Sequence, residues 1–189
     1  ILKWPSLNKL AQTSEPNILE FWSGLGYYSR ARNLLKSAKI IKNNFKNKIP
    51  ETYDELIQLP GIGDYTAKAI LGIGYNKSVM PLDANIERIL VRLHAIDKPI
   101  NKVKNKLKDL GKKFISDKYS SNLIQSFMDY GSEICLPRNP KCNICGINKF
   151  CQSYKKNLQQ KIPFKQKKKS NKPIKYTSCL LYTSDAADD

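Results

Sequence analysis

The 189-residue sequence lacks any long apolar run and contains one histidine and two methionines. No stretch approaches the roughly 18 consecutive apolar residues that a membrane-spanning helix needs. No basic, then apolar, then small-residue leader is visible at its start. These absences argue against an integral helical membrane protein and a secreted one, so we expect a globular, cytoplasmic protein.

Alternation of apolar and polar residues, the pattern of a half-buried strand, is also missing over any useful length. Apolar residues recur instead at helical spacing over 27–45 and 84–96. Further helices are expected over 15–22, 53–58, 64–75, 101–117 and 121–135, with Thr52 and Asp83 placed as N-terminal caps. The sequence therefore predicts an all-α fold.

Acidic residues are scarce: 33 lysines and arginines face 16 aspartates and glutamates, which gives a net charge of +17. A strongly basic chain most often binds an acidic partner, above all nucleic acid. A basic surface that is merely solvated fits the same numbers, and charge does not say which face binds. Over 155–178, nine lysines, no acidic residue and two prolines predict a basic linker and not a packed element.

Residues 179–189 differ from the rest of the chain. They match the translated end of a transposon-derived sequencing adapter, so we expect them to be an assembly artefact. Without them, 33 basic residues face 13 acidic ones, a net charge of +20, and four cysteines remain. The sequence begins with Ile1, in what reads as the middle of an element, so we expect truncation at both ends.

Residues 59–63, Leu-Pro-Gly-Ile-Gly, form a tight-turn sequence between two expected helices. Two glycines around an apolar residue let the backbone turn sharply with its N–H groups pointing outward. At a helix start such amides favour an anion, and a DNA phosphate fits there without its sequence being read. A plain turn between helices has the same local pattern, although the longer form through Thr66 and Ala67 is more specific for DNA binding.

The four remaining cysteines are Cys135, Cys142, Cys145 and Cys151, spaced C-x6-C-x2-C-x5-C. Four thiolates so close in sequence can enclose one metal centre. Disulfides are disfavoured because nothing indicates secretion. Zinc sites usually show two C-x2-4-C pairs, and this segment has one, whereas a cubane iron–sulfur cluster needs one cysteine at each of its four corners.

From about Leu2 to Tyr154 the chain resembles the helix-hairpin-helix, iron–sulfur superfamily of endonuclease III and MutY, in which this cysteine spacing holds a [4Fe–4S] cluster. Residues 22–34, WSGLGYYSRARNL, resemble the W-x-G-L-G-Y-Y-x-R-A-R-N-L signature of the MutY branch. Lyase-active relatives have a lysine two residues after the hairpin's last glycine, where this chain has Tyr65. The resemblance implies a monofunctional glycosylase that removes adenine mispaired with 8-oxoguanine or guanine in base excision repair.

Asp83 is the candidate catalytic residue, within a segment at 81–88, PLDANIER, that resembles the family's (L/V)-D-G-N-V-x-R-V. Its simpler interpretation is a helix N-cap. Hydrolysis of an N-glycosidic bond builds positive charge on the sugar, which a fixed carboxylate stabilises. The resemblance implies this role for Asp83, a supporting role near the sugar for Asn85, and a role in the adenine pocket for Tyr65. Ala84 replaces the family's glycine, which removes no reactive group.

The DNA contacts that the resemblance implies come from three segments. They are Gly61, Ile62, Gly63 and Thr66 of the hairpin, Tyr27 and Arg30 of the signature, and Arg138 and Lys141 of the first cysteine loop. The target adenine must leave the base stack, and Tyr27 matches a residue that wedges beside the oxidised guanine. A core aromatic is its other interpretation. The implied partner is double-stranded DNA with adenine mispairs, bound by a monomer.

The resemblance also implies a domain organisation. Residues 1–77 would be part of a six-helix barrel that includes the hairpin, residues 78–154 an iron–sulfur cluster domain, and residues 155–178 the linker towards a Nudix-like domain. The family's general acid is a glutamate in a segment like E-x-x-L-Q-Q-T, which these 189 residues do not contain. We therefore expect this piece by itself to bind DNA but to cut little.

Two other functions stay open. A bifunctional glycosylase and lyase of the endonuclease III type would have the same fold, but Tyr65 argues against it. Trapping of a protein–DNA adduct with borohydride would distinguish the two. A non-catalytic iron–sulfur DNA-binding module would explain the charge and the cysteines, but Asp83 and Asn85 argue against it.

Overall fold

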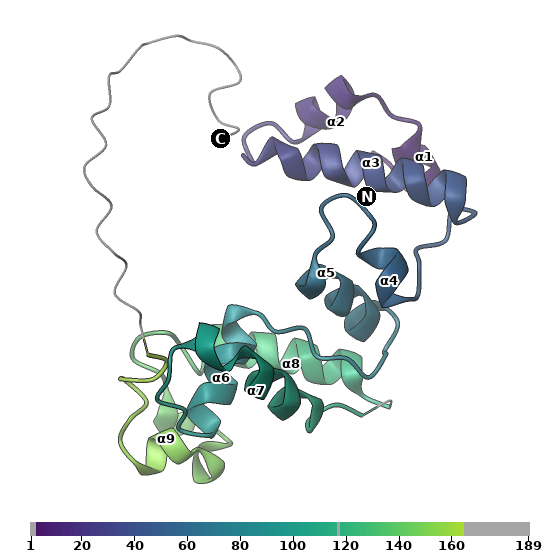
Figure 1. The fold of residues 1–189 in the computed structure, drawn as a ribbon. Coiled ribbons are helices and arrows are strands. Elements are labelled where there is room, and N and C mark those ends of the chain that lie inside the picture. The colour runs from purple at the N-terminus through teal and green to yellow at the C-terminus, as the bar shows by residue number, and fades with distance from the viewer. Residues whose placement is uncertain (1–2, 117, 165–189) are drawn as a thin grey trace. The chain divides into compact units, whose positions relative to one another are not determined.

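The computed structural model describes residues 3–116 and 118–164, and every regular element in these two ranges is helical (Figure 1). The all-α prediction is confirmed. No helix in the described part of the chain is long and apolar enough to cross a bilayer. The chain divides into one compact unit that ends at Gly63 and a second that begins at Asp64. The expected artefact at 179–189 and the predicted linker beyond residue 164 lie outside the described residues.

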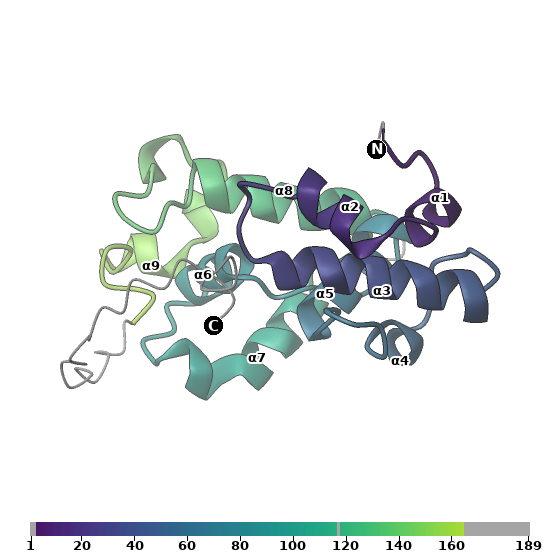
Figure 2. The ribbon, with the colours of Figure 1, turned by 90° about the horizontal axis from the view of Figure 1, so that it is seen from above.

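The first unit is built around one long helix. It contains α1 (Leu7–Ala11), α2 (Glu15–Phe21), α3 (Tyr28–Asn44) and α4 (Tyr53–Leu56). Both α1 and α2 pack against α3 (Figures 1 and 2). Ile18, Ala31 and Leu35 form the buried core between them, because the apolar positions of α3 fall on one face.

The short helix α4 begins where the sequence predicts. The Thr52 hydroxyl accepts a hydrogen bond from the backbone N–H of Glu55 at 3.4 Å and donates to its carboxylate at 2.6 Å. This side-chain exchange satisfies an amide that the first helical turn leaves without a partner. The cap thus sets the first residue of α4, directly before the hairpin turn.

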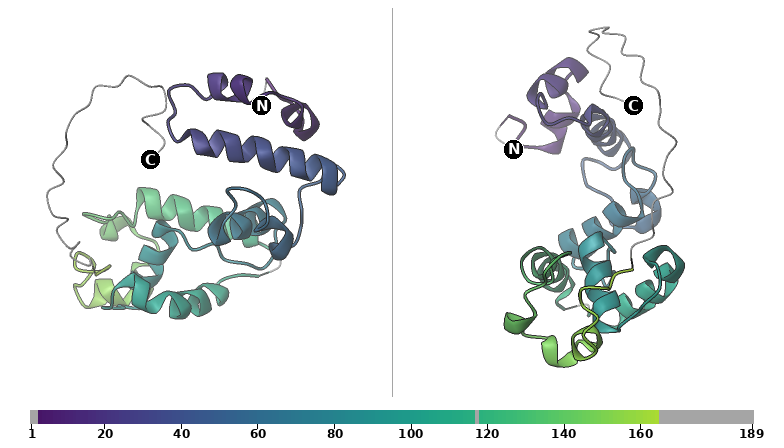
Figure 3. Two further views of the ribbon diagram at one scale, coloured as in Figure 1. Left: turned by 45° about the horizontal axis from the view of Figure 1, so that its top comes forward. Right: turned by 90° about the vertical axis from the view of Figure 1, so that its left-hand side faces the viewer.

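The second unit contains α5 (Asp64–Ala69), η1 (Ile70–Gly74), α6 (Ala84–Leu93), α7 (Ile100–Lys112), α8 (Ser120–Glu133) and α9 (Gln152–Lys155). Two short 3-10 turns, η2 (Cys142–Ile144) and η3 (Asn148–Phe150), precede α9. Helix α6 packs against α7, α8 and α9 and is the central element of this unit (Figure 3). Its apolar stripe supplies Ile86, Leu90 and Val91 to the buried core.

The helix predicted over 64–75 is α-helical only to Ala69 and continues as the wider π-turn η1. The widening coincides with Gly72, whose backbone approaches Ile124 of α8 and the Val79 carbonyl so closely that a Cβ atom would not fit. Packing against α8 thus accompanies a change of helix type that the periodicity did not show.

Two observations bear on the expected organisation. The second compact unit begins at Asp64, while the expected boundary between the barrel and the cluster domain at 77–78 stays a prediction. In the predicted linker, Ile162 is 3% exposed and Leu158 packs against the same core, so these two residues attach the start of the segment to the second unit. The many lysines of this segment predicted an unpacked linker. Its apolar residues Leu158 and Ile162, four positions apart, were the signal for packing.

Candidate functional site

Asp83 lies at the N-terminus of α6, as expected for a cap. Its Oδ1 accepts a hydrogen bond from the backbone N–H of Ile86 at 2.7 Å. No described residue donates to the second carboxylate oxygen in the structure. The simpler interpretation as a cap is therefore correct, and it leaves one oxygen of a fixed carboxylate open to another partner.

Tyr65 of α5 lies near Asp83, although 17 residues separate them in the sequence. Burial raises the pKa of Tyr65 above its ordinary value, and the negative charge of Asp83 raises it further. The phenol therefore stays protonated at neutral pH and keeps a donor beside the carboxylate. The side chain is 41% exposed, which leaves it open to a ligand.

Asn85 is held in place by contacts with two residues that the sequence analysis did not single out. Its side-chain oxygen accepts from the Arg88 guanidinium at 2.9 Å. Gly131 of α8 approaches it so closely that an added Cβ would lie 2.6 Å from the Asn85 Cβ. Arg88 is 5% exposed and also donates to the Cys135 carbonyl at 2.7 Å, so the start of α6 is tied to the first cysteine loop.

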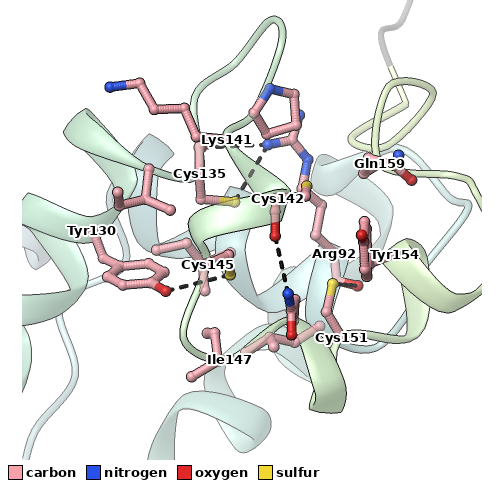
Figure 4. Close-up of a pocket in the computed structure, with 15 residues that line it drawn as sticks. Arg92, Tyr130, Cys135, Lys141, Cys142, Cys145, Ile147, Cys151, Tyr154 and Gln159 are labelled. Carbon is pink, nitrogen blue, oxygen red and sulfur yellow. Dashed lines mark hydrogen bonds between the residues drawn. The ribbon is translucent and has the colours of Figure 1, made fainter.

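Cys135, Cys142, Cys145 and Cys151 line one cavity of the second unit (Figure 4). The rest of its wall is largely apolar and includes Ile89, Leu93, Ile134 and Ile147. Its empty volume is about 420 Å³, part of which is open to solvent. The tertiary structure thus brings together all four cysteines that the spacing predicts to act jointly.

Two side chains donate hydrogen bonds to cysteine sulfurs of this cavity. The guanidinium of Arg92, which is 2% exposed, donates to Cys135 Sγ at 3.3 Å. The Tyr130 hydroxyl donates to Cys145 Sγ at 3.3 Å, as the dashed lines in Figure 4 show. Arg92 also donates to the Leu136 carbonyl at 2.6 Å, which fixes the start of the cysteine loop on α6.

The electrostatics of the cavity reflect four thiols close together. Burial raises the pKa of Cys142, and the other three cysteines raise it further, while Arg92 lowers it. Among the described residues, no three candidate ligand side chains come close enough to hold a single metal ion. A cubane cluster meets its cysteines at four separate corners, so four thiols around one cavity fit such a group.

The hairpin turn belongs to the first unit, and only one of its two glycines is required by the backbone. Gly61 has φ of 77°, and a Cβ added there would lie 2.9 Å from the Asn33 Cβ. Gly63 has open space around it and no positive φ. The Ser37 hydroxyl donates to the Pro60 carbonyl at 2.8 Å and anchors the turn on α3. The expectation that both glycines enable the turn is thus correct for Gly61 alone.

The other predicted DNA contacts are at the surface. Tyr27 caps α3 with φ of 49° and is 74% exposed, so its interpretation as a core aromatic is wrong. Arg30 stacks over the Trp22 ring at 5.4 Å from the guanidinium carbon to the ring centre. In the second unit, Arg138 and Lys141 are exposed on the first cysteine loop.

Known proteins resemble this chain in sequence. Residues 2–113 match the family described as HhH-GPD superfamily base excision DNA repair protein. The adenine DNA glycosylase of Buchnera aphidicola subsp. Baizongia pistaciae is 44% identical over 183 residues, which cover 96% of this chain and 52% of that protein. Human adenine DNA glycosylase is 32% identical over 163 residues, covering 85% of this chain and 30% of the human protein. The chain spans about half the length of the Buchnera relatives it matches.

Solved structures share the fold. A thermostable thymine-DNA glycosylase aligns with a TM-score of 0.73 at 25% identity, covering 82% of this chain and 72% of that one. Endonuclease III in a non-covalent DNA complex aligns with a TM-score of 0.66 at 22% identity, covering 84% and 73%. The helical fold and the family match over residues 2–113 show that the chain belongs to the HhH-GPD superfamily of base excision DNA repair proteins.

Proposed function

We propose that the protein to which these residues belong is a monofunctional DNA glycosylase that removes adenine mispaired with 8-oxoguanine or guanine. The observation that carries this proposal is the fixed carboxylate of Asp83 at the start of α6, with Tyr65 of α5 near it. It stands in a chain that is 44% identical to a protein named adenine DNA glycosylase. A fixed carboxylate and a neutral phenol are the groups expected where a sugar cation forms beside a base.

Asp83 is proposed to stabilise the positive charge that develops on the deoxyribose as the N-glycosidic bond breaks. The hydrogen bond from Ile86 N–H to Oδ1 holds the carboxylate in place before the reaction. The other oxygen remains open to the sugar. Asn85, held by Arg88, is proposed to position the sugar and backbone of the extruded nucleotide.

Tyr65 supports a hydrolytic reaction without a lyase step. A lyase forms a Schiff base through an amine, and the Tyr65 phenol has none. Its raised pKa keeps the hydroxyl protonated. Tyr65 is therefore proposed to donate a hydrogen bond in the adenine pocket and to leave an abasic site as the product.

The proposed DNA contacts use backbone amides and exposed cations. In the hairpin turn these are the amides of Gly61 and Gly63, which would hold a phosphate. The Ile62 amide already donates to the Leu59 carbonyl at 3.1 Å, so Ile62 is proposed to meet DNA through its side chain. Thr66 of α5 is a further proposed contact. Arg138 and Lys141 would meet the backbone from the first cysteine loop. Tyr27 is proposed to wedge between bases, with Arg30 beside it, because its ring is exposed at the end of a helix.

The four cysteines are proposed to hold a [4Fe–4S] cluster, with Arg92 and Tyr130 donating hydrogen bonds to two of the sulfurs. When bound, such a cluster cross-links the segment between Cys135 and Cys151 and carries one-electron chemistry. The cavity that all four thiols line supports this assignment. No step of adenine removal is assigned to it.

The test of the activity is single-turnover cleavage of a duplex with one adenine opposite 8-oxoguanine, by the complete protein that contains this chain. Alkali is added afterwards to break abasic sites. Asp83→Asn should lower the rate constant by at least about 100-fold, the scale seen when a transition-state charge partner is lost. A variant that cuts at the wild-type rate would show that Asp83 is only a helix cap, and a wild-type protein that spares adenine would overturn the function.

A further inference from the structure

Tyr130 occupies a particular place in the second unit. Its ring lines the cysteine cavity and also a neighbouring apolar groove that includes Phe114, Leu123 and Phe127. Only its hydroxyl reaches a sulfur, that of Cys145, at 3.3 Å (Figure 4). The ring therefore forms part of the cavity wall, and the hydroxyl is a separate feature directed at one ligand.

The two side-chain donors serve different cysteines. Arg92 donates to Cys135 and Tyr130 donates to Cys145. Arg92 also holds the carbonyls of Leu136 and Ile162, so its removal would disturb the loop itself. The Tyr130 hydroxyl donates to the Cys145 sulfur and also faces the backbone N–H groups of Gly146 and Ile147. It anchors no carbonyl of the cysteine loop, so its removal leaves every hydrogen bond of Arg92 in place.

A hydrogen bond to a thiolate ligand stabilises the more negative state of an iron–sulfur cluster more than the less negative one. The reduced cluster carries one more negative charge than the oxidised cluster. A donor on a ligand sulfur therefore raises the reduction potential, and its loss makes removal of one electron easier.

We propose that Tyr130 raises the reduction potential of the cluster by donating its hydroxyl hydrogen to the Cys145 thiolate. This inference rests on the cluster assigned under the proposed function. Tyr130 acts here as a positioning and tuning residue, and it takes no part in adenine removal. Arg92 supplies the second donor, to Cys135, the first of the four cysteines in the sequence.

The experiment compares the anaerobically purified complete protein with Tyr130→Phe, which keeps the ring in the wall and removes only the hydroxyl. Iron and acid-labile sulfide are counted first, and each should be unchanged. A potentiometric titration with one-electron mediators then follows the cluster. The variant should have the lower potential, with the ratio of oxidised to reduced cluster up to about tenfold higher at a fixed potential, or about 59 mV for one electron.

Tyr154→Phe is the matched control, because Tyr154 lines the same cavity and the structure gives its hydroxyl no bond to a sulfur among the described residues. Its potential should equal that of the wild type. Incorporation of 3-fluorotyrosine at position 130, a stronger hydroxyl donor, should shift the potential upward. The two changes at one position thus have opposite expected signs.

The outcomes separate this inference from the function on which it rests. Full iron content with equal potentials in wild type and Tyr130→Phe would overturn the role of Tyr130 and leave the cluster standing. A wild-type protein without iron would overturn both. Loss of iron in Tyr130→Phe alone would show that the hydroxyl helps to retain the cluster. If the fluorotyrosine protein then had the same potential as the wild type, the tuning role of Tyr130 would be refuted.

Discussion

At Asp83 a single carboxylate has a structural task and, by our proposal, a chemical one. Because asparagine caps helices about as well as aspartate, Asp83→Asn should change the free energy of unfolding by only a few tenths of a kcal/mol while abolishing adenine removal. Asp83→Ala should remove both the helix cap and the catalytic carboxylate, and it should lower the free energy of unfolding by about 0.5–2 kcal/mol. Urea unfolding of the two variants beside the cleavage assay checks this. Equal losses of stability would show that the cap at Ile86 N–H depends on charge.

Tyr65 gives a second residue-scale prediction, on the choice between hydrolysis and lyase chemistry. Tyr65→Lys places an amine near Asp83. We expect the variant to form a borohydride-trapped adduct with DNA that the wild type does not form. The measurement is the shifted band on a denaturing gel after reduction. Tyr65→Phe serves as the control because it lacks both amine and hydroxyl. An adduct in the wild type would favour the bifunctional alternative.

At the scale of elements, the hairpin turn depends on one glycine. Gly61→Ala puts a Cβ at φ of 77° and within 2.9 Å of the Asn33 Cβ, so it should destabilise the protein by about 1–3 kcal/mol. Gly63→Ala meets open space and should be close to neutral. The midpoint of urea unfolding measures both changes.

The same pair of variants also tests the DNA contact. If the turn presents amides to a phosphate, Gly61→Ala should weaken binding of undamaged duplex DNA, because the backbone can no longer hold its direction. Gly63→Ala should bind the duplex with the affinity of the wild type. All three proteins are compared at a temperature and urea concentration at which each is fully folded. Equal effects at the two positions would contradict the distinction that the backbone geometry draws.

At the scale of the whole molecule, the net charge of +17 predicts DNA binding that weakens steeply with salt. Each neutralised phosphate contributes about −0.9 to the slope of log K against log salt. Arg138→Gln and Lys141→Gln should each flatten the slope by about that amount. Lys112→Gln, in an exposed residue outside the predicted contacts, should leave it unchanged. Fluorescence anisotropy across a salt series gives the slopes, and a salt-independent affinity would refute the idea.

The cysteine cavity predicts the metal content of the molecule. The protein purified without oxygen should contain about four irons and four labile sulfides per chain. Cys142→Ser should reduce the iron, since it removes one corner ligand. Removal of iron by a chelator should lower the unfolding temperature, because the cluster links Cys135 to Cys151. Stoichiometric zinc with no iron would contradict the assignment.

Much of the helical structure could be predicted from the sequence because its causes are local. Apolar spacing gave α3 and α6, and a hydroxyl three residues before a glutamate gave the cap of α4. The π-turn η1 could not be predicted in this way. It coincides with the approach of Gly72 to Ile124 of α8, a contact between residues 52 positions apart.

The sequence by itself determined the all-α class, the cap at Asp83 and the set of four cysteines, since spacing along the chain carries each of them. Only the tertiary structure decided that Tyr65 lies near Asp83, that Arg88 and Gly131 hold Asn85, and that Tyr130 and Arg92 reach cysteine sulfurs. Apart from the Arg88–Asn85 bond, which lies within α6, these contacts join segments far apart in the sequence. Their geometry follows from how α6 packs against α8 and the cysteine loop, and no local pattern encodes a distance between side chains so far apart in the chain.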